Sequence, residues 1–367
     1  MAIRTVFHLE LTDCCNFNCA FCKSVRRQNK ATLDYDIAIR CMDVMKDHTV
    51  HGIYLNSVQF NGSGEALLYP RLDEIIVEAR KRFPMAEFVT NGSLLTEERI
   101  RTLLATDIDM IEISLTGIIP EVYQHFQGSG IPYDKCVTQL KTVMENVHTL
   151  LRLRNEMHKE TYIRLRYIRS RELGSYQHFK DYVKYWKNSG VDEIFVTALW
   201  DFKRHPIKDI KKLKVIRCHC MNSPMKVNAN GEVFSCANNH DLVRYSLGNV
   251  NDTDLADIIT SEAFIMDKAN KMTVDLNRVP KTCLSCECRA YRKFSEEIMN
   301  MRRRIFFKKP VKSFFYRFFG IMDICYERFN RNDLFHKIFW TYLCRQSKRI
   351  HDDFNEQQLR KAGEKVR

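Results

Sequence analysis

The feature that most constrains the fold is an alternation of short apolar strands with longer amphipathic segments over the first two hundred residues. Each strand candidate is rich in β-branched or aromatic residues, and strands that alternate with helices are typical of parallel βαβ units. The expected strands are Thr5–Leu11, Ser57–Asn61, Glu87–Thr90, Met110–Leu115, Ile163–Ile168 and Glu193–Ala198. The expected helices are Tyr35–Lys46, Leu72–Arg82, Glu97–Leu104, Tyr133–Met157 and Tyr176–Ser189.

Six strands joined by helices predict an α/β fold, either an open parallel sheet or a partial barrel. Thr96 stands directly before Glu97 and is the expected N-cap of the third helix. In both architectures ligand sites form at the carboxyl ends of the strands. The residues that follow each predicted strand are therefore the first candidates for a site.

Cysteine is the second constraint, with 14 in a chain of 367 residues. The first residues, MAIRTVFHLELTD, are too charged and too briefly apolar for a secretory signal. No run reaches the ~18 apolar residues that a membrane helix needs. We therefore expect a cytoplasmic protein, in which thiols stay reduced and this cysteine content indicates metal binding or thiol chemistry rather than disulfides.

The first cysteine cluster follows the first predicted strand. In CCNFNCAFC, Cys15, Cys19 and Cys22 have the spacing C-x3-C-x2-C. Three thiolates on one loop suit one iron–sulfur cluster or one zinc ion. Three ligands leave one position of a four-iron cluster open to a substrate or cofactor, which favours catalysis over simple electron transfer. Cys14 breaks the spacing and is expected to pack.

With Phe21 before its last cysteine, this loop resembles the signature of the radical S-adenosylmethionine (SAM) superfamily. Later turns strengthen the resemblance, each at the end of a predicted strand. Asn61–Ala66 is similar to the family's G-G-E-P turn, Thr90–Gly92 matches its T-N-G, and Ser114–Gly117 resembles its S-x-D-G. Together these motifs cover residues 5 to 200.

The resemblance implies a partial (β/α)6 TIM-like barrel. A 4Fe-4S cluster on Cys15, Cys19 and Cys22 would bind SAM at its open iron and cleave it reductively, and the 5′-deoxyadenosyl radical would abstract hydrogen from a substrate. The glycines would let the backbone approach SAM, the glutamate would accept from its ammonium, the serine would meet its carboxylate or ribose, and the phenylalanine would lie against its adenine. The implied cofactor-binding residues are Phe21, Gly62, Gly64, Glu65 and Ser114.

The sequence departs from the family pattern at three points. Ala66 stands where proline is usual, and Thr116 where aspartate is usual. The arginine that often follows the S-x-D-G motif and contacts the SAM carboxylate is missing from Gly128–Gly130. That contact is unassigned, with Arg164 and Arg166 on the fifth predicted strand as candidates.

A second cysteine cluster begins near residue 218. Gly231 to Cys236 reads G-x4-C, a hairpin turn at Asn230-Gly231 that leads into a strand. The pattern resembles the SPASM and twitch extensions of radical SAM enzymes. It implies an auxiliary 4Fe-4S cluster on one set of four thiols, for which Cys220 and Cys288 are substitutes. A zinc ribbon is the alternative. The four expected ligands are Cys218, Cys236, Cys283 and Cys286.

The net charge of +13 is concentrated at the end of the chain. Residues 289–367 hold 20 Lys and Arg against 9 Asp and Glu, which is +11. An apolar stripe predicts an amphipathic helix there, which suits either an anionic membrane surface or packing on the barrel or a partner subunit, with RNA binding a weaker reading. Residues 351–367 are expected to form a solvated helix or frayed end. The stripe consists of Phe315, Phe318, Met322, Cys325 and Phe329.

These features predict three units: a radical SAM barrel (1–205), an auxiliary cluster domain (206–300) and a basic, aromatic-rich helical tail (301–367). The auxiliary cluster can accept an electron from a substrate radical. We therefore expect a radical SAM oxidoreductase or epimerase that acts on a sugar-type or other small molecule. Its electron donor is expected to be a low-potential flavodoxin or ferredoxin. The tail adds an expected peripheral contact with the inner membrane face.

Two alternatives stay open. One is a peptide-maturing radical SAM enzyme of the RiPP (ribosomally made and modified peptide) type. Many relatives of that kind carry a peptide-binding extension before the barrel, and a cluster that begins at Cys15 leaves no room for one. The other is a zinc-stabilised nucleic-acid-binding protein, which explains the CxxC motif and basic tail but not the motifs after the strands. No Asp, Glu or Tyr is singled out as a general base.

Overall fold

The structure is a computed structural model that describes residues 5–22, 30–50, 52–169, 176–198, 225–236, 246–273, 275, 277–279, 303–306 and 333–364. The first cysteine loop lies within these ranges. Three of the four expected auxiliary ligands, Cys218, Cys283 and Cys286, lie outside them, as do Cys220 and Cys288. The apolar stripe of the tail also lies outside the described residues.

Six parallel strands form the body of the sheet, in the order β1-β4-β5-β6-β7-β8. All six expected strands are confirmed, and the expected alternation with helices gives each parallel neighbour its crossover. The strands follow one another in chain order, as in a partial (β/α)6 barrel. Their bounds are β1 (Val6–Leu9), β4 (Ser57–Phe60), β5 (Met85–Thr90), β6 (Met110–Ser114), β7 (Tyr162–Arg169) and β8 (Glu193–Ala198).

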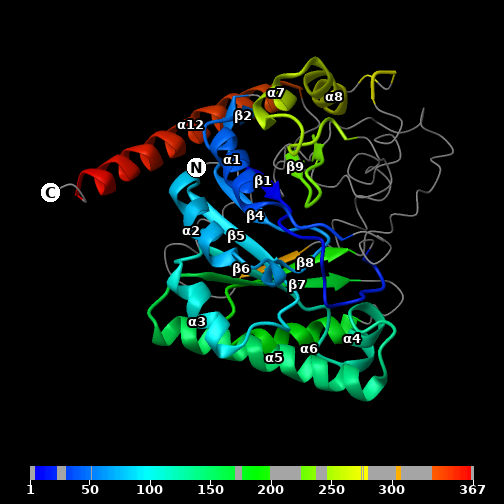
Figure 1. Ribbon diagram of the computed structural model, residues 1–367. Helices are drawn as coiled ribbons and strands as arrows, with labels where there is room; N and C mark the ends of the chain where they lie inside the picture. The colour runs from blue at the N-terminus through cyan, green and yellow to red at the C-terminus, as the bar shows by residue number, and fades with distance from the viewer. Residues whose placement is uncertain are drawn as a thin grey trace.

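Helices cover the outer face of these strands (Figure 1). Thr96 caps its helix as expected, because its hydroxyl accepts from the backbone N–H of Arg99 at 3.2 Å. Asp34 caps the first helix in the same way, through Asp36 and Ile37. The short helix α4 (Pro120–Phe126) is not among the helices expected from the sequence. The other helices of this layer are α1 (Tyr35–Met45), α2 (Leu72–Arg82), α3 (Glu97–Ala105), α5 (Tyr133–Glu156) and α6 (Tyr176–Trp186).

The two faces of the strands carry different residues. Phe7 and Leu9 are buried in the main hydrophobic core, and the Phe7 ring lies 6.4 Å from the ring of Phe83 at the end of α2. Because side chains alternate along a strand, His8 and Glu10 point to the opposite, inner face. That inner face is polar and buried: His8 bonds Asn61, and Arg164 contacts the carboxylates of Glu112 and Glu193 from neighbouring strands, among others.

Both edges of the barrel sheet are extended by strands that the sequence analysis did not predict as neighbours. On one side β9 (Met225–Val227) pairs in parallel with β1, and β10 (Val233–Phe234) pairs antiparallel with β9. On the other side β11 (Arg303–Phe306) pairs antiparallel with β8. Helices α7 (Leu255–Thr260) and α8 (Glu262–Met272) follow the β9–β10 hairpin. A small separate hairpin joins β2 (Thr49–Val50) to β3 (Ile53–Tyr54).

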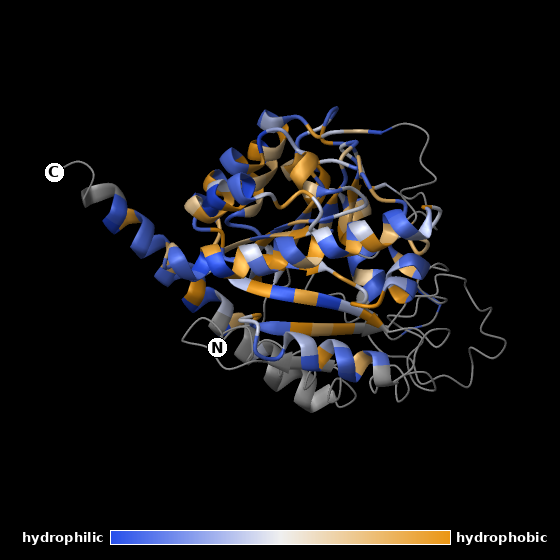
Figure 2. Cartoon of the chain, turned by 90° about the horizontal axis from the view of Figure 1, so that it is seen from below, coloured by the Kyte–Doolittle hydropathy of each residue, from blue (hydrophilic) through white to orange (hydrophobic). Residues whose placement is uncertain are grey.

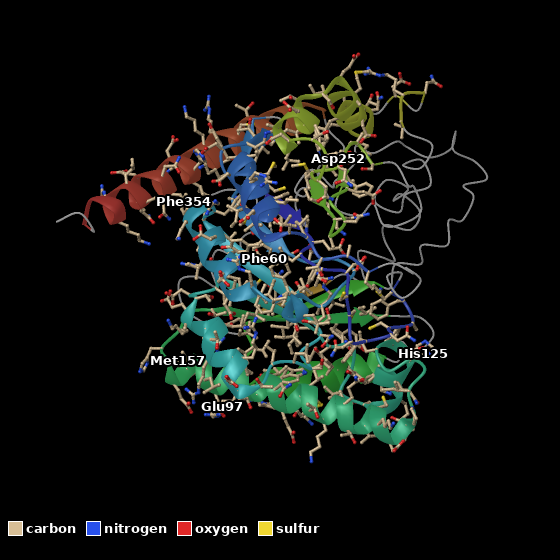
Figure 3. All side chains as sticks on the ribbon, in the orientation of Figure 1. Phe60, Glu97, His125, Met157, Asp252 and Phe354 are labelled. Atoms are coloured by element: carbon tan, nitrogen blue, oxygen red, sulfur yellow. The ribbon has the colours of Figure 1, made fainter. Side chains whose placement is uncertain are left out.

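The chain ends in a long helix, α12 (Asp333–Glu364), which confirms the helical reading of residues 351–364. It crosses the β2–β3 hairpin, where the ring of His351 stacks on the ring of Tyr54 at 3.9 Å. Its end, beyond the labelled Phe354, projects from the body and is mostly hydrophilic (Figures 2 and 3). Within the described part of the chain, no helix is both long and apolar enough to span a membrane.

Candidate active site at the carboxyl ends of the strands

The first cysteine loop leaves β1 and is held by backbone hydrogen bonds to its neighbours. The N–H of Glu65 donates to the carbonyl of Cys14 at 2.8 Å, which ties the loop to the turn after β4. The N–H of Ala20 donates to the carbonyl of Phe126 at 2.8 Å, which ties it to the end of α4. Within the loop, Cys22 N–H bonds the carbonyl of Cys19 at 2.9 Å. The loop is therefore a defined element of the site.

The three cysteines of the signature are half-buried. Burial raises the pKa of the thiols of Cys15 and Cys19, and the nearby Cys22 thiol adds to the effect. Without a metal these two thiols are therefore neutral. No three thiol, imidazole or carboxylate groups of the described residues stand at metal-binding spacing. In a four-iron cluster each thiolate binds a different iron, so such a cluster needs no three groups around one ion. Loading the cluster would release the protons of the thiols.

The turn after β4 comes too close to β1 for side chains. A Cβ on Gly64 would lie 2.7 Å from the carbonyl oxygen of Cys14 and closer still to that of Thr12. A Cβ on Gly62 would overlap the carboxylate of Glu10. Only glycine fits these two positions, so the backbone of the turn lies directly against the start of the cysteine loop.

Glu65 is buried at the end of this turn. Its carboxylate accepts hydrogen bonds from the N–H of Leu67 at 3.1 Å and from the N–H of Asn91 at 2.7 Å. Burial raises the pKa of this carboxyl group above its ordinary value. Asn91 in turn donates to the side-chain oxygen of Asn16 at 2.8 Å. The structure therefore brings the second and third sequence motifs together beside the cysteine loop.

The fourth motif is closed by a residue that sequence reasoning missed. The side-chain oxygen of Gln127 accepts from both the N–H and the hydroxyl of Thr116, and its amide donates to the carbonyl of Ser114 at 2.7 Å. Thr116, in the place of the family's aspartate, is thus engaged within its own loop. Ser114 lies at the carboxyl end of β6, opposite Arg166 of β7. A glutamine 11 residues after Thr116 gave no local signal.

Family models match two parts of this chain. The Radical SAM superfamily model matches residues 9–153, and the model of an iron–sulfur cluster-binding SPASM domain matches residues 218–287. The first match runs from the last residue of β1 into α5 and contains all four motifs. The chain belongs to the radical SAM superfamily and carries a SPASM domain.

Two curated relatives illustrate this membership. The radical SAM chain is 23% identical over 333 residues to the tungsten-containing aldehyde ferredoxin oxidoreductase cofactor-modifying protein of Pyrococcus furiosus. That match covers 77% of this chain and 87% of the relative. It is also 28% identical over 127 residues to the PqqA peptide cyclase of Streptomyces rochei, which covers 34% of this chain and 33% of the cyclase.

Solved structures share the fold. The radical SAM chain aligns with SuiB of Streptococcus suis bound to S-adenosylmethionine with a TM-score of 0.56 and 14% sequence identity. The alignment covers 78% of this chain and 71% of SuiB. A second SuiB structure, bound to the precursor peptide SuiA, aligns with a TM-score of 0.54 and 14% identity over 72% of this chain and 66% of SuiB.

The donor set of this radical SAM protein fits a SAM-binding 4Fe-4S cluster. Three soft thiols share one loop, and none of the described cysteines forms a disulfide. In the glycine turn beside them, Gly62 is exposed and Gly64 is partly exposed. The cofactors that the family implies, SAM and 4Fe-4S clusters, are therefore matched by the residues present.

Phe21 lies next to the last signature cysteine and packs against α4. Its ring centroid is 6.3 Å from that of Phe126, whose ring also meets the edge of the His125 ring at 4.9 Å. Figure 3 labels His125 at the end of α4. This aromatic group borders the cysteine loop, the side on which the radical SAM family resemblance places adenine.

The two candidate arginines on β7 have different surroundings. Arg164 is 2% exposed and contacts Glu193 at 2.9 Å and Glu112 at 3.2 Å, so its charge is used inside the barrel. Arg166 is 32% exposed, pairs with the other oxygen of Glu112, and lies beside Ser114 in the strand register. Of the two, only Arg166 is accessible to a ligand at the carboxyl ends of the strands.

In the SPASM domain the structure describes one of the four expected ligands, Cys236. It is half-buried and follows β10, after the Asn230-Gly231 turn that the sequence predicted. The preceding residue, Ser235, bonds the carboxylate of Asp267 and accepts from the ammonium of Lys271 at 2.6 Å. Helix α8 therefore holds the backbone next to Cys236.

Proposed function

We propose that this radical SAM enzyme modifies a peptide by hydrogen abstraction. The observation that carries the proposal is the combination of a radical SAM barrel and a SPASM domain with a fold similar to that of SuiB, which has been solved bound to a precursor peptide. The similarity to a PqqA peptide cyclase points the same way. These likenesses favour the peptide alternative over the sugar-type substrate that the auxiliary cluster first suggested.

A second candidate is modification of a small organic cofactor. It is favoured by the cofactor-modifying protein of Pyrococcus furiosus, whose match covers most of both chains. This candidate agrees with the small-molecule substrate expected from the sequence. The type of reaction, net oxidation or epimerisation, also stays a prediction. A low-potential flavodoxin or ferredoxin stays the predicted electron donor.

The roles of the chain's own residues follow from their positions. Cys15, Cys19 and Cys22 would hold the SAM-binding cluster, and the backbone around Gly62 and Gly64 would receive the methionine end of SAM. When bound, these cofactors supply a radical that abstracts hydrogen from the substrate.

Three further cofactor contacts belong to the same proposal. Glu65 would accept from the SAM ammonium, Ser114 would donate to its carboxylate or ribose, and Phe21 would cover adenine. The buried polar inner face of the barrel would limit water around the reacting atoms.

The SPASM domain would provide the electron acceptor. Cys218, Cys236, Cys283 and Cys286 would hold a closed auxiliary cluster, which would supply a one-electron acceptor for substrate oxidation. The unit boundaries 1–205, 206–300 and 301–367 stay predictions; the family matches to residues 9–153 and 218–287 are compatible with them.

The substrate proposal is tested with the reconstituted holoenzyme, SAM and dithionite. Synthetic peptides encoded by short reading frames next to the gene are compared with nucleotide sugars and free organic cofactors. We expect a peptide to stimulate 5′-deoxyadenosine formation. The amount of peptide with a changed mass should equal the amount of 5′-deoxyadenosine formed. A Cys15/Cys19/Cys22→Ala variant is the inactive control. Turnover of a sugar or cofactor, with every peptide left unchanged, would contradict the proposal.

The cytoplasmic location of the protein and the contact of its tail with an anionic membrane stay predictions. The segment that carries the apolar stripe lies outside the described residues, and the projecting end of α12 is mostly hydrophilic. A flotation assay with anionic vesicles tests the contact. Replacing Lys308, Lys309 and Lys312 with glutamine should reduce vesicle binding. Absence of binding by the unaltered protein would refute it.

A further inference from the structure

A strand of the SPASM domain lies directly beside the strand that leads into the SAM-cluster loop. Strand β9 pairs in parallel with β1, with His8 opposite Lys226 and Leu9 opposite Val227. The N–H of Glu10 donates to the carbonyl of Val227 at 2.9 Å, which extends the pairing by one residue. The two domains therefore share one continuous sheet at this point. A shift in the position of one strand would displace the strand paired with it.

A buried ion pair joins the same two strands. The ammonium of Lys226 lies 3.3 Å from a carboxylate oxygen (Oε2) of Glu10, and the two side chains are 3% and 1% exposed. The contact is a charge contact without hydrogen-bond alignment, since Oε2 has no hydrogen-bond partner in the described part of the chain. Removing one member of such a pair is strongly unfavourable, because it leaves the other as an uncompensated buried charge.

The second carboxylate oxygen of Glu10 contacts the Gly62–Glu65 turn after β4. Oε1 accepts a hydrogen bond from the N–H of Ser63, and it lies against Gly62, where a Cβ would overlap it. One oxygen of Glu10 therefore contacts Lys226 of the SPASM domain. The other oxygen fixes Ser63, which lies between the two glycines of the turn. The link between Lys226 and that turn therefore runs through the two carboxylate oxygens of Glu10.

We propose that Lys226 is a positioning residue which, through Glu10, fixes the Gly62–Glu65 turn in the conformation that receives the methionine end of SAM. The affinity of the barrel for SAM then depends on a residue of the SPASM domain. Without the ammonium, the Glu10 carboxylate is left as an uncompensated buried charge, so it moves away from this position and accepts less strongly from the N–H of Ser63. This role holds for any substrate, so it does not depend on the peptide proposal.

The test measures SAM binding to the anaerobically reconstituted full chain by equilibrium dialysis. It is combined with the change that SAM produces in the EPR spectrum of the reduced cluster. Lys226→Met should raise the SAM Kd about tenfold or more, because the ion pair that holds Glu10 is lost, with iron content unchanged. Lys226→Arg, which keeps the charge, should restore most of the affinity and the spectral change.

The matched control is Lys271→Met, which removes another lysine of the SPASM region with a buried carboxylate partner, Asp267, at 2.6 Å. It should leave the SAM Kd unchanged. Equal weakening by Lys271→Met would mean general loosening of the domain and would overturn the proposal. So would wild-type affinity in Lys226→Met, or an arginine variant as weak as the methionine variant.

A fallback variant covers failure to fold. If Lys226→Met does not hold its cluster, Lys226→Gln takes its place, since glutamine removes the charge but keeps a polar group beside Glu10. Its SAM Kd should rise by a smaller factor, about threefold or more, relative to Lys226→Arg. A Kd equal to that of Lys226→Arg would contradict the proposal.

Discussion

The carboxylate of Glu65 accepts a hydrogen bond from the backbone N–H of Asn91, with 2.7 Å between Oε2 and N. This bond joins the turn after β4 to the turn after β5, two motifs that lie 26 residues apart in the chain. Its other oxygen caps the short helix Ala66–Leu68 through Leu67. One buried side chain therefore holds the two turns together at the proposed SAM site, and it is the group that we infer to receive the SAM ammonium.

Glu65→Gln separates folding from SAM binding. The amide keeps one acceptor oxygen, but its NH2 group faces one of the two backbone N–H donors that the carboxylate accepts. The free energy of unfolding at pH 7 should therefore fall by about 1–3 kcal/mol, which still leaves the chain folded. Loss of the carboxylate should raise the SAM Kd about tenfold or more, because a charged contact is lost. Urea unfolding and equilibrium dialysis measure the two quantities. Unchanged SAM affinity would remove Glu65 from the cofactor site.

The raised pKa of Glu65 gives this comparison a pH dependence. The folded state keeps the proton at a higher pH than the unfolded state, whose carboxyl titrates near 4.5. The contribution of this group to stability therefore increases as pH falls through the folded pKa towards 4.5, and decreases as pH rises. The unfolding free energy of the wild type relative to Glu65→Gln should be larger at pH 5 than at pH 8. The opposite trend would show that the pKa is lowered.

Gly64→Ala tests the close approach of the glycine turn to the cysteine loop. The new methyl group would overlap the backbone carbonyls of Thr12 and Cys14, so the turn must move. We expect a loss of SAM binding of at least tenfold. Ser63→Ala, one residue away, keeps the backbone N–H that bonds Glu10 and should bind SAM like the wild type. Normal SAM binding by Gly64→Ala would show that the turn accommodates a methyl group at this position, which would contradict the close approach.

The two arginines of β7 should behave differently when replaced by methionine. Arg164→Met leaves the buried carboxylates of Glu112 and Glu193 without this counter-charge, and should destabilise the fold by about 3–5 kcal/mol. Arg166→Met affects a partly exposed side chain whose partner Glu112 keeps Arg164, and should cost less than about 1 kcal/mol. Urea unfolding distinguishes the two; equal losses would be evidence against this assignment of the charges.

The docking of α12 on the β2–β3 hairpin is tested by His351→Ala. This change removes the ring stacked on Tyr54 and the contact with Asp47 at 3.1 Å, and should cost about 1 kcal/mol. It should also speed hydrogen exchange in the hairpin. Leu359→Ala on the projecting part, 73% exposed, should leave both unchanged. Equal exchange rates in the two variants would mean that α12 does not dock there in solution.

Much of the barrel could be predicted because its signals are local. Strand runs, amphipathic helices and the Thr96 cap are each contained in a few residues, and all are confirmed. The pairings of β9 with β1 and of β11 with β8 were not predictable in this way. They join residues over a hundred positions apart, and a three-residue strand such as Met225–Val227 carries no periodic pattern of its own.

In the candidate site, too, features with a local sequence signal were predicted and features that depend on long-range contacts were not. The cysteine loop and the glycine turns were found from spacing, and the structure places them side by side. Gln127, Glu10 and Lys226 were missed, because each acts through contacts that only the folded chain creates. Arg164 and Arg166 looked equivalent in sequence, since they occupy the same face of one strand. Neighbouring carboxylates from β6 and β8 enclose the first and leave the second accessible.

The central claim is that this chain holds one SAM-binding cluster in the barrel and a second cluster in the SPASM domain. The most direct measurement is iron and sulfide per chain after anaerobic reconstitution, in the wild type and in Cys15/Cys19/Cys22→Ala, with Cys14→Ala as the matched control. We predict about eight irons in the wild type and in the control, and about four in the triple variant. About four irons in the wild type and none in the triple variant, with one zinc retained, would contradict the claim and make the second site structural.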